Sequence, residues 1–174
     1  MLKPFYSIFT STKVFSYFSL FSISFHMMIK SLIFIFFTSF HIFALDIIGN
    51  FETVKLNQFT TNYTVAKVDT GAVYSALHCT YIKLNEDENS VLFTLLDSNT
   101  TFKKKIVKIA NIKSSNGQEE KRPIIETTII LGKETYPIKF SLTNRSAMKT
   151  KILLGTDFIK NRFLVDVSKQ NLKD

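Results

Sequence analysis

The sequence predicts an all-β domain that begins after residue 45 and contains little helix. From Leu45 onward, short apolar or alternating segments are separated by polar turn signals such as Asn116-Gly117 and Gly132-Lys133. Lys139 to Leu142 alternates with period two, which places successive side chains on opposite faces of a strand. We expect strands at Glu52–Leu56, Tyr63–Val68, Ser90–Leu96, Phe102–Ile112, Ile124–Leu131, Thr135–Leu142, Ile152–Leu154 and Arg162–Asp166.

Two short stretches are candidates for helix, Ser146–Thr150 and Asp157–Asn161. Asp157 is expected to cap the second, because a carboxylate can accept a hydrogen bond from the first free N–H groups of a helix. Asp166 is expected to end a strand. Together the elements predict a small barrel or sandwich with one short helix near its end. About 130 residues suffice for one core and one domain, which we place at residues 46–174.

Residues 1–45 differ sharply from the rest of the chain. They hold eleven of the eighteen Phe residues, three Lys and no Asp or Glu, whereas all fourteen acidic residues follow. Lys30 precedes an apolar run that ends at Ala44, which is typical of a secretory signal peptide. The true start of the protein is then expected at Met27 or Met28.

The apolar run is short for a membrane span, which needs about 20 apolar residues. The alternative is one uncleaved N-terminal anchor built from both apolar stretches of residues 1–45. In either case we expect the domain to be exported to the periplasm or secreted, or held at the inner membrane. Its only expected membrane contact is through an uncleaved leader.

Charge and cysteine content exclude several classes of protein. The formal net charge of +8 includes three lysines of the leader. The basic charge by itself does not indicate a nucleic-acid partner, because nucleic-acid binding calls for basic residues clustered on one face, and we expect none. The lone Cys79 excludes an intramolecular disulfide and is expected to be a small buried residue. Lys103-Lys104-Lys105 is expected to be a solvated strand edge that discourages aggregation, or else a patch attracting acidic substrates.

Two segments carry the chemistry. Residues 65–78, VAKVDTGAVYSALH, place Asp69 directly after an apolar strand and two residues before Gly71. Such a loop can present a carboxylate that activates a water molecule, although the same triplet also occurs in ordinary turns. Residues 151–166, KILLGTDFIKNRFLVD, place Leu153 and Leu154 before Gly155. The second segment by itself could be a buried strand that ends in a turn.

In this order the two segments resemble the retropepsin-like aspartic peptidases that carry the name ATP-dependent zinc protease. The resemblance covers roughly residues 47–168 and includes RPIIETTIILGKETYPIKFSLTNRSAM, residues 122–148. It implies a small closed barrel of the retropepsin type, with a flap that we place at Asp97–Thr101. It also assigns site residues: Asp69, Thr70 and Gly71 as catalytic, Leu153, Leu154 and Gly155 as supports of the loop, and Ala72 and Tyr74 as substrate contacts. Tyr74 stands where the family often has Thr.

Aspartic catalysis requires two carboxylates that share one proton, because both cannot be ionised at close range. The chain has a single Asp-Thr-Gly. We therefore expect a symmetric homodimer in which Asp69 of each subunit forms a dyad that hydrolyses a peptide or protein substrate. The resemblance implies that Thr70 braces the two loops across the two-fold axis. Family members without an exported leader are associated with ribosomal-protein glutamate ligases and cleavage of glutamate tails, a substrate that an exported domain is not expected to meet.

The zinc and ATP of the family name find no support in the residues. Zinc needs three or four converging ligands, and the domain's only His and Cys are the neighbours His78 and Cys79. No GxxxxGK[ST] phosphate loop occurs. We expect no cofactor and a structural role for His78. Two rival hypotheses remain, a non-catalytic module that binds a peptide by strand addition and a metal-dependent hydrolase.

Overall fold

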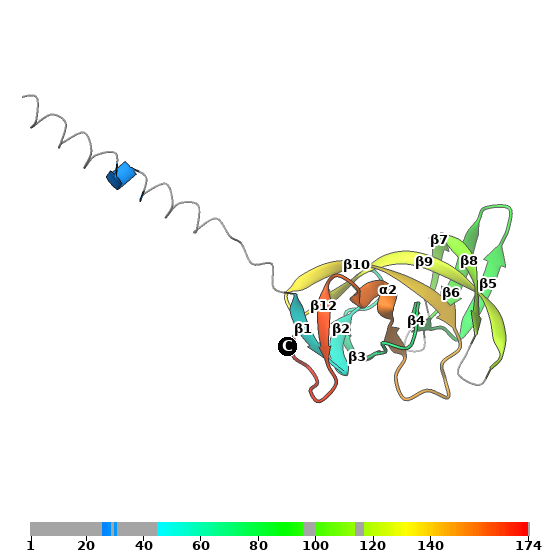
Figure 1. Ribbon diagram of the computed structural model, residues 1–174. Coiled ribbons are helices and arrows are strands. Elements are labelled where there is room, and N and C mark those ends of the chain that lie inside the picture. Colours follow the sequence, from blue (N-terminus) through cyan, green and yellow to red (C-terminus); the bar gives the residue numbers. More distant parts are fainter. Residues whose placement is uncertain (1–25, 29, 31–44, 96–99, 114–116, 174) are drawn as a thin grey trace, which may run out of the picture. The chain divides into compact units, whose positions relative to one another are not determined.

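The computed structural model describes residues 26–28, 30, 45–95, 100–113 and 117–173 (Figure 1). The chain divides into two units, residues 1–44 and 45–174, and the second is the folded domain. Most of the predicted leader, including its cleavage site, therefore lies outside the described residues. Among the helices of these described ranges, none combines the length and apolar character needed to span a membrane.

The folded domain is built almost entirely from strands. In chain order the elements are β1 (Asp46–Gly49), β2 (Phe51–Lys55), β3 (Tyr63–Val68), β4 (Ser75–His78), β5 (Tyr81–Asn85), β6 (Ser90–Thr94), β7 (Thr101–Lys105), β8 (Lys108–Lys113), β9 (Glu119–Leu131), β10 (Glu134–Thr143), β11 (Ile152–Leu154), α2 (Thr156–Ile159) and β12 (Phe163–Asp166). This confirms the predicted all-β class with a short helix near the end of the chain.

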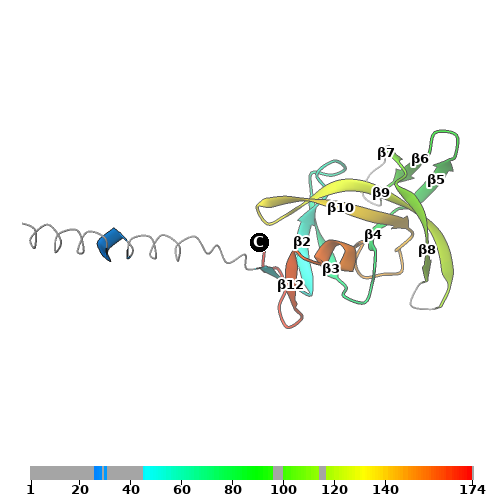
Figure 2. The same ribbon diagram turned by 45° about the horizontal axis from the view of Figure 1, so that its top comes forward.

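The main sheet closes on itself into a ring. Its order is β10-β4-β11-β3-β2-β9, and an antiparallel pairing of β9 with β10 joins its ends. β8 adds to the outer side of β9, where it forms an antiparallel hairpin. A separate sheet of β5, β6 and β7 lies at the side of the domain away from β1 and β12 (Figures 1 and 2).

Alternation along the ring strands fills its interior with apolar side chains. In β3, Ala66 and Val68 are buried while the intervening Lys67 is exposed. The largest fully buried side chains are Phe93, Phe140, Phe158, Ile48, Leu77, Ile124, Ile125, Ile129, Leu131, Leu142, Ile152 and Leu154. Each such burial stabilises the fold by about 1.5–3 kcal/mol before the entropic cost. Two aromatic clusters extend this core: Phe59–Phe93–Phe102 and Tyr136–Phe158–Phe163.

Several elements differ from the sequence-based expectations. β4 lies between β10 and β11 and all four of its residues are buried, so it lacks the alternation that identifies a strand. β1 and β5 were not expected either. The predicted strand Phe102–Ile112 is two strands, β7 and β8, because the chain passes from one sheet to another at Ile106 and Val107.

The helical expectations were half right. α2 covers most of the predicted Asp157–Asn161, but Ser146–Thr150 forms turns and bends instead of a helix. The N-cap of α2 is Gly155, and no side chain caps the helix. The capping role predicted for Asp157 is therefore wrong. Asp166 ends β12, as predicted.

Candidate active site

Asp69 begins the tight loop that leads from β3 to β4. Its N–H donates to the Leu154 carbonyl at 2.9 Å, and its Oδ1 accepts a hydrogen bond from the Gly71 N–H at 3.0 Å. An Asp that accepts from its own chain two residues on forms a local turn without needing a regular element. The Asp69 side chain keeps 27% of its surface exposed. The loop therefore fixes one carboxylate oxygen and leaves the carboxylate open to a substrate.

β11 and α2 support this loop from behind. β11 pairs with β3 in parallel, with Leu154 opposite Val68. The first N–H groups of a helix lack partners inside the helix. In α2 the N–H of Thr156 donates to the Ala72 carbonyl at 2.8 Å, and the N–H of Asp157 donates to Val73 at 3.0 Å. The first two N–H groups of α2 are thus satisfied by carbonyls of the Asp69 loop.

Gly155 lies so close to the end of the loop that no side chain fits there. A Cβ at this position would lie 2.6 Å from the carbonyl carbon of Tyr74 and 2.9 Å from the nitrogen of Ser75. The Ser75 hydroxyl accepts from the Gly155 N–H at 3.0 Å and donates to Asp157 Oδ1 at 2.8 Å. Asp157 therefore ties α2 to β4 instead of capping its own helix.

A cavity of about 970 Å³ opens beside Asp69. Of the predicted site residues, Asp69, Gly71, Ala72, Tyr74 and Leu153 line it. Thr70 is exposed and is not among the lining residues. Leu154 and Gly155 are buried behind the loop.

The cavity is rich in positive charge. Its basic lining residues are Lys67, Lys113, Arg122, Arg145 and Lys149. Among the described residues that line it, Asp69 is the sole carboxylate. The Lys67 ammonium lies 3.3 Å from Asp69 Oδ2, and Arg122 pairs with Glu120 at 2.7 Å. Burial lowers the pKa of Arg145, the nearby Arg122 lowers it further, and Asp69 raises it; the guanidinium stays charged at neutral pH.

Sequence reasoning missed the basic residues of this cavity. Lys67 could have been found, because alternation with buried Ala66 and Val68 places it on the opposite face of β3. Arg145 lies in a segment that forms turns after β10, and only folding brings it to Asp69. No periodic pattern marks such a loop residue.

The hairpin that lines the cavity is β8–β9, which contributes Asn111, Ile112, Lys113 and Arg122. Lys108 of β8 donates to the Tyr74 hydroxyl at 2.9 Å, and its ammonium lies 4.8 Å from the centre of the Tyr74 ring. Most of the flap predicted at Asp97–Thr101 lies outside the described residues. Within the described residues, β8–β9 is a hairpin that lines the Asp69 cavity.

The residues do not fit the zinc that the family name implies. In the described part of the chain, no three His, Cys, Asp or Glu residues come together. His78 is buried, and its Nδ1 accepts a hydrogen bond from the Arg145 N–H at 2.7 Å. Burial raises the pKa of Cys79 to about 12, so its thiol is neutral at physiological pH and is a poor metal ligand.

An Asp-Thr-Gly loop supported by an apolar-apolar-Gly strand, within a closed all-β ring, defines the retropepsin class of fold. Residues 47–174 match the family described as RimB-like, retropepsin-like aspartic endopeptidase RimB. The chain therefore belongs to this RimB-like family.

The domain is also similar to parts of longer proteins and to one solved structure. A probable alpha-L-glutamate ligase of Shewanella pealeana is 36% identical over 131 residues, covering 71% of this chain and 29% of the relative. One from Desulfotalea psychrophila is 30% identical over 135 residues, covering 73% and 29%. The chain thus spans under a third of the length of these relatives. The crystal structure of Lpg0085 from Legionella pneumophila, of unknown function, is 27% identical with a TM-score of 0.63, covering 75% of this chain and 100% of that one.

Proposed function

We propose that this domain is an aspartic endopeptidase whose active form is a homodimer with one Asp69 from each subunit. The observation that carries the proposal is the open Asp69 carboxylate on a loop supported by β11 and α2, beside a cavity with no second carboxylate among its described lining residues. Aspartic catalysis needs two carboxylates. A second copy of the chain is the simplest source of the other one.

In such a dimer the two carboxylates share one proton and hold a water molecule between them. The ionised carboxylate takes a proton from the water as its oxygen attacks the scissile carbonyl carbon. The protonated carboxyl donates its proton to the carbonyl oxygen. When the tetrahedral intermediate collapses, the C–N bond breaks and the amine leaves with the proton that the first carboxylate took from the water. One hydroxyl of the intermediate returns its proton to the other carboxylate, which restores the singly protonated dyad. The products are one carboxylic acid and one amine.

The basic lining of the cavity favours substrates with acidic side chains around the cleaved bond. Lys67 of β3, Arg122 of β9 and Arg145 from the segment after β10 line the same cavity as Asp69. Arg forms short, charge-assisted hydrogen bonds with carboxylates. The relatives named alpha-L-glutamate ligases carry this domain within a longer protein, which is consistent with a glutamate-containing substrate.

We also infer that the leader exports the domain, so its acidic substrate lies outside the cytoplasm. The support is compositional: residues 1–45 combine three lysines with many apolar residues and no acidic ones. Fusion of alkaline phosphatase after residue 50 tests this, because that reporter becomes active only after export. An inactive fusion, beside an active control fusion with a known signal peptide, would contradict export.

The peptidase proposal is tested with fluorogenic peptides of one length that differ only in Glu or Gln around the central bond. Cleavage of the Glu peptide, inhibition by a statine-containing peptide and loss of cleavage in Asp69→Asn are expected. Cleavage that persists in Asp69→Asn would refute the mechanism. Tight binding of the Glu peptide without any cleavage would instead indicate a peptide-binding module.

A further inference from the structure

A second cavity, of about 500 Å³, lies on the other side of strands β4 and β11 from the Asp69 cavity. Ala76 and Leu153 line the Asp69 cavity, whereas their chain neighbours Leu77 and Ile152 line the second one. Successive side chains of a strand point to opposite faces. The two cavities share no described lining residue, so they are separate sites.

The second cavity has an apolar floor. Leu56, Phe59, Leu77, Leu95 and Ile152 are each buried and line it. The floor belongs to the main core cluster, so it is packed and preformed. A preformed concave apolar surface with a few polar groups at its mouth is the usual form of a small-molecule site.

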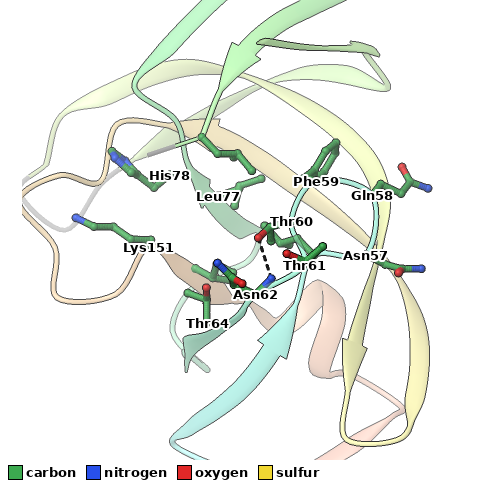
Figure 3. A pocket seen from close by; sticks show the side chains of 13 residues that line it. Asn57, Gln58, Phe59, Thr60, Thr61, Asn62, Thr64, Leu77, His78 and Lys151 are labelled. Atoms are coloured by element: carbon green, nitrogen blue, oxygen red, sulfur yellow. Dashed lines mark hydrogen bonds between the residues drawn. The ribbon is translucent and has the colours of Figure 1, made fainter. Parts of the chain in front are cut away.

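The mouth of this cavity carries hydroxyl, amide and amino groups. In Figure 3, Lys151 and His78 lie on one side and the threonines and amides of the β2–β3 loop on the other. The Thr60 hydroxyl accepts from the Asn62 N–H at 3.0 Å, so its own hydrogen is left to donate. The Lys151 ammonium donates to the Ser146 carbonyl at 3.2 Å and has two further N–H donors.

The charge of the cavity favours an anion. Among its described lining residues, none is a carboxylate and Lys151 is the sole formal charge. The hydroxyls of Thr61 and Thr64 can also donate.

We propose that this cavity binds a small organic carboxylate whose apolar body lies on the floor. The carboxylate oxygens accept hydrogen bonds from Lys151 and from threonine hydroxyls at the mouth. The site is distinct from the one in which Asp69 acts, and its occupation requires no peptidase activity.

The test uses residues 45–174, which form one compact unit and contain the whole main core cluster. N-acetyl-L-leucine is titrated into the protein, and the backbone amide NMR signals of the protein report its binding. The uncharged N-acetyl-L-leucinamide is the control ligand. Saturable shifts at Thr61, Thr64 and His78 are expected, with affinity at least about fivefold weaker for the amide.

Lys151→Met should weaken carboxylate binding by about fivefold, whereas Lys149→Met, which changes the same charge in the other cavity, should not. If Lys151→Met lowers the melting temperature, Thr64→Val is used in its place. Val is favourable in a strand and removes the Thr64 hydroxyl, so carboxylate binding should weaken in this variant too. Binding should be unchanged in Asp69→Asn, so failure here is distinguishable from failure of the peptidase proposal. Absence of saturation, equal binding of the amide, or shifts centred on Asp69 would overturn the proposal.

Discussion

The two cavities of this domain lie against the same two strands and differ completely in chemistry. The Asp69 cavity is lined by five basic residues and one described carboxylate. The cavity beside the β2–β3 loop is lined by hydroxyl and amide groups, and among its described lining residues Lys151 is the one formal charge. The alternation of β4 and β11 separates them: Ala76 and Leu153 face one side, Leu77 and Ile152 the other. A single layer of strands can therefore serve two unrelated ligands.

The cavities also differ in how their polar groups are held. The Asp69 loop receives backbone hydrogen bonds from β11 and α2, elements more than 80 residues away in sequence. The backbone of the β2–β3 loop is held locally, since the N–H groups of Phe59 and Thr60 both donate to the Leu56 carbonyl. Its Gln58 side chain accepts hydrogen bonds from the distant Lys104 and Thr127. Changes in α2 should therefore affect the Asp69 cavity far more than the second one, whereas β11 borders both cavities.

The largest expected effect comes from Asp69→Asn. Loss of one carboxylate from each subunit removes both the base and the acid of the proposed dyad, so kcat for the Glu peptide should fall by at least about a thousandfold. The side chain is partly exposed and the amide can still accept from the Gly71 N–H. The melting temperature and the binding of N-acetyl-L-leucine should stay near wild type. A variant that cleaves at more than a tenth of the wild-type rate would contradict this role.

Gly155→Ala should have the second largest effect on cleavage. The added Cβ would meet the backbone of Tyr74 and Ser75 at under 3.0 Å, so the loop must move. We expect the free energy of unfolding to fall by about 3 kcal/mol and kcat to fall more than the destabilisation explains. Urea denaturation and peptide cleavage on the folded fraction measure the two effects. Wild-type stability with wild-type cleavage would show that β11 does not position the loop.

Arg145→Gln tests whether the positive charge of the Asp69 cavity binds acidic substrates. The backbone N–H that donates to His78 is retained, so the link between Arg145 and β4 survives. We expect KM for the Glu peptide to rise about tenfold while KM for the Gln peptide stays unchanged. Lys133→Gln, an exposed lysine outside the lining residues of both cavities, is the matched control. Equal changes for both peptides would assign Arg145 a purely structural role.

The smallest effect concerns Cys79, a buried residue of the main core cluster that directly follows β4. Burial raises the pKa of Cys79 from 9.0 to about 12. Its contribution to stability is therefore fully present below pH 9 and is lost as the pH rises toward 12, because the unfolded thiol ionises first. Relative to Cys79→Ala, the wild-type free energy of unfolding should fall by about 1.4 kcal/mol between pH 8 and pH 10. A constant difference would mean that water reaches the Cys79 thiol in the folded domain.

The sequence predicted the all-β class and several strands because their apolar residues alternate or form short runs. Tyr63–Val68 and Ile152–Leu154 were predicted with the observed bounds. β4 was missed because a strand inside the ring buries every residue and shows no period. Asp157 was misassigned because its partner, Ser75, lies 82 residues away, and no local pattern records such a contact.

The same limit applies to the sites. Asp69 and Gly155 stand in recognisable local motifs, so their neighbourhood could be predicted. The basic lining of the Asp69 cavity comes from β3, β8, β9 and the turns after β10, and the second cavity from loops and strand ends. The lining residues of each cavity come together only when the chain folds, so no local sequence pattern marks them.

The pairing of two Asp69 residues from two chains is tested most directly by mixing subunits. Wild-type and Asp69→Asn domains are unfolded together, refolded at fixed total concentration and assayed on the Glu peptide as the wild-type fraction is varied. If each site needs one Asp69 from each subunit, cleavage falls with the square of the wild-type fraction. Cleavage that falls in direct proportion to that fraction would show that a single chain carries a complete site, and would contradict the account.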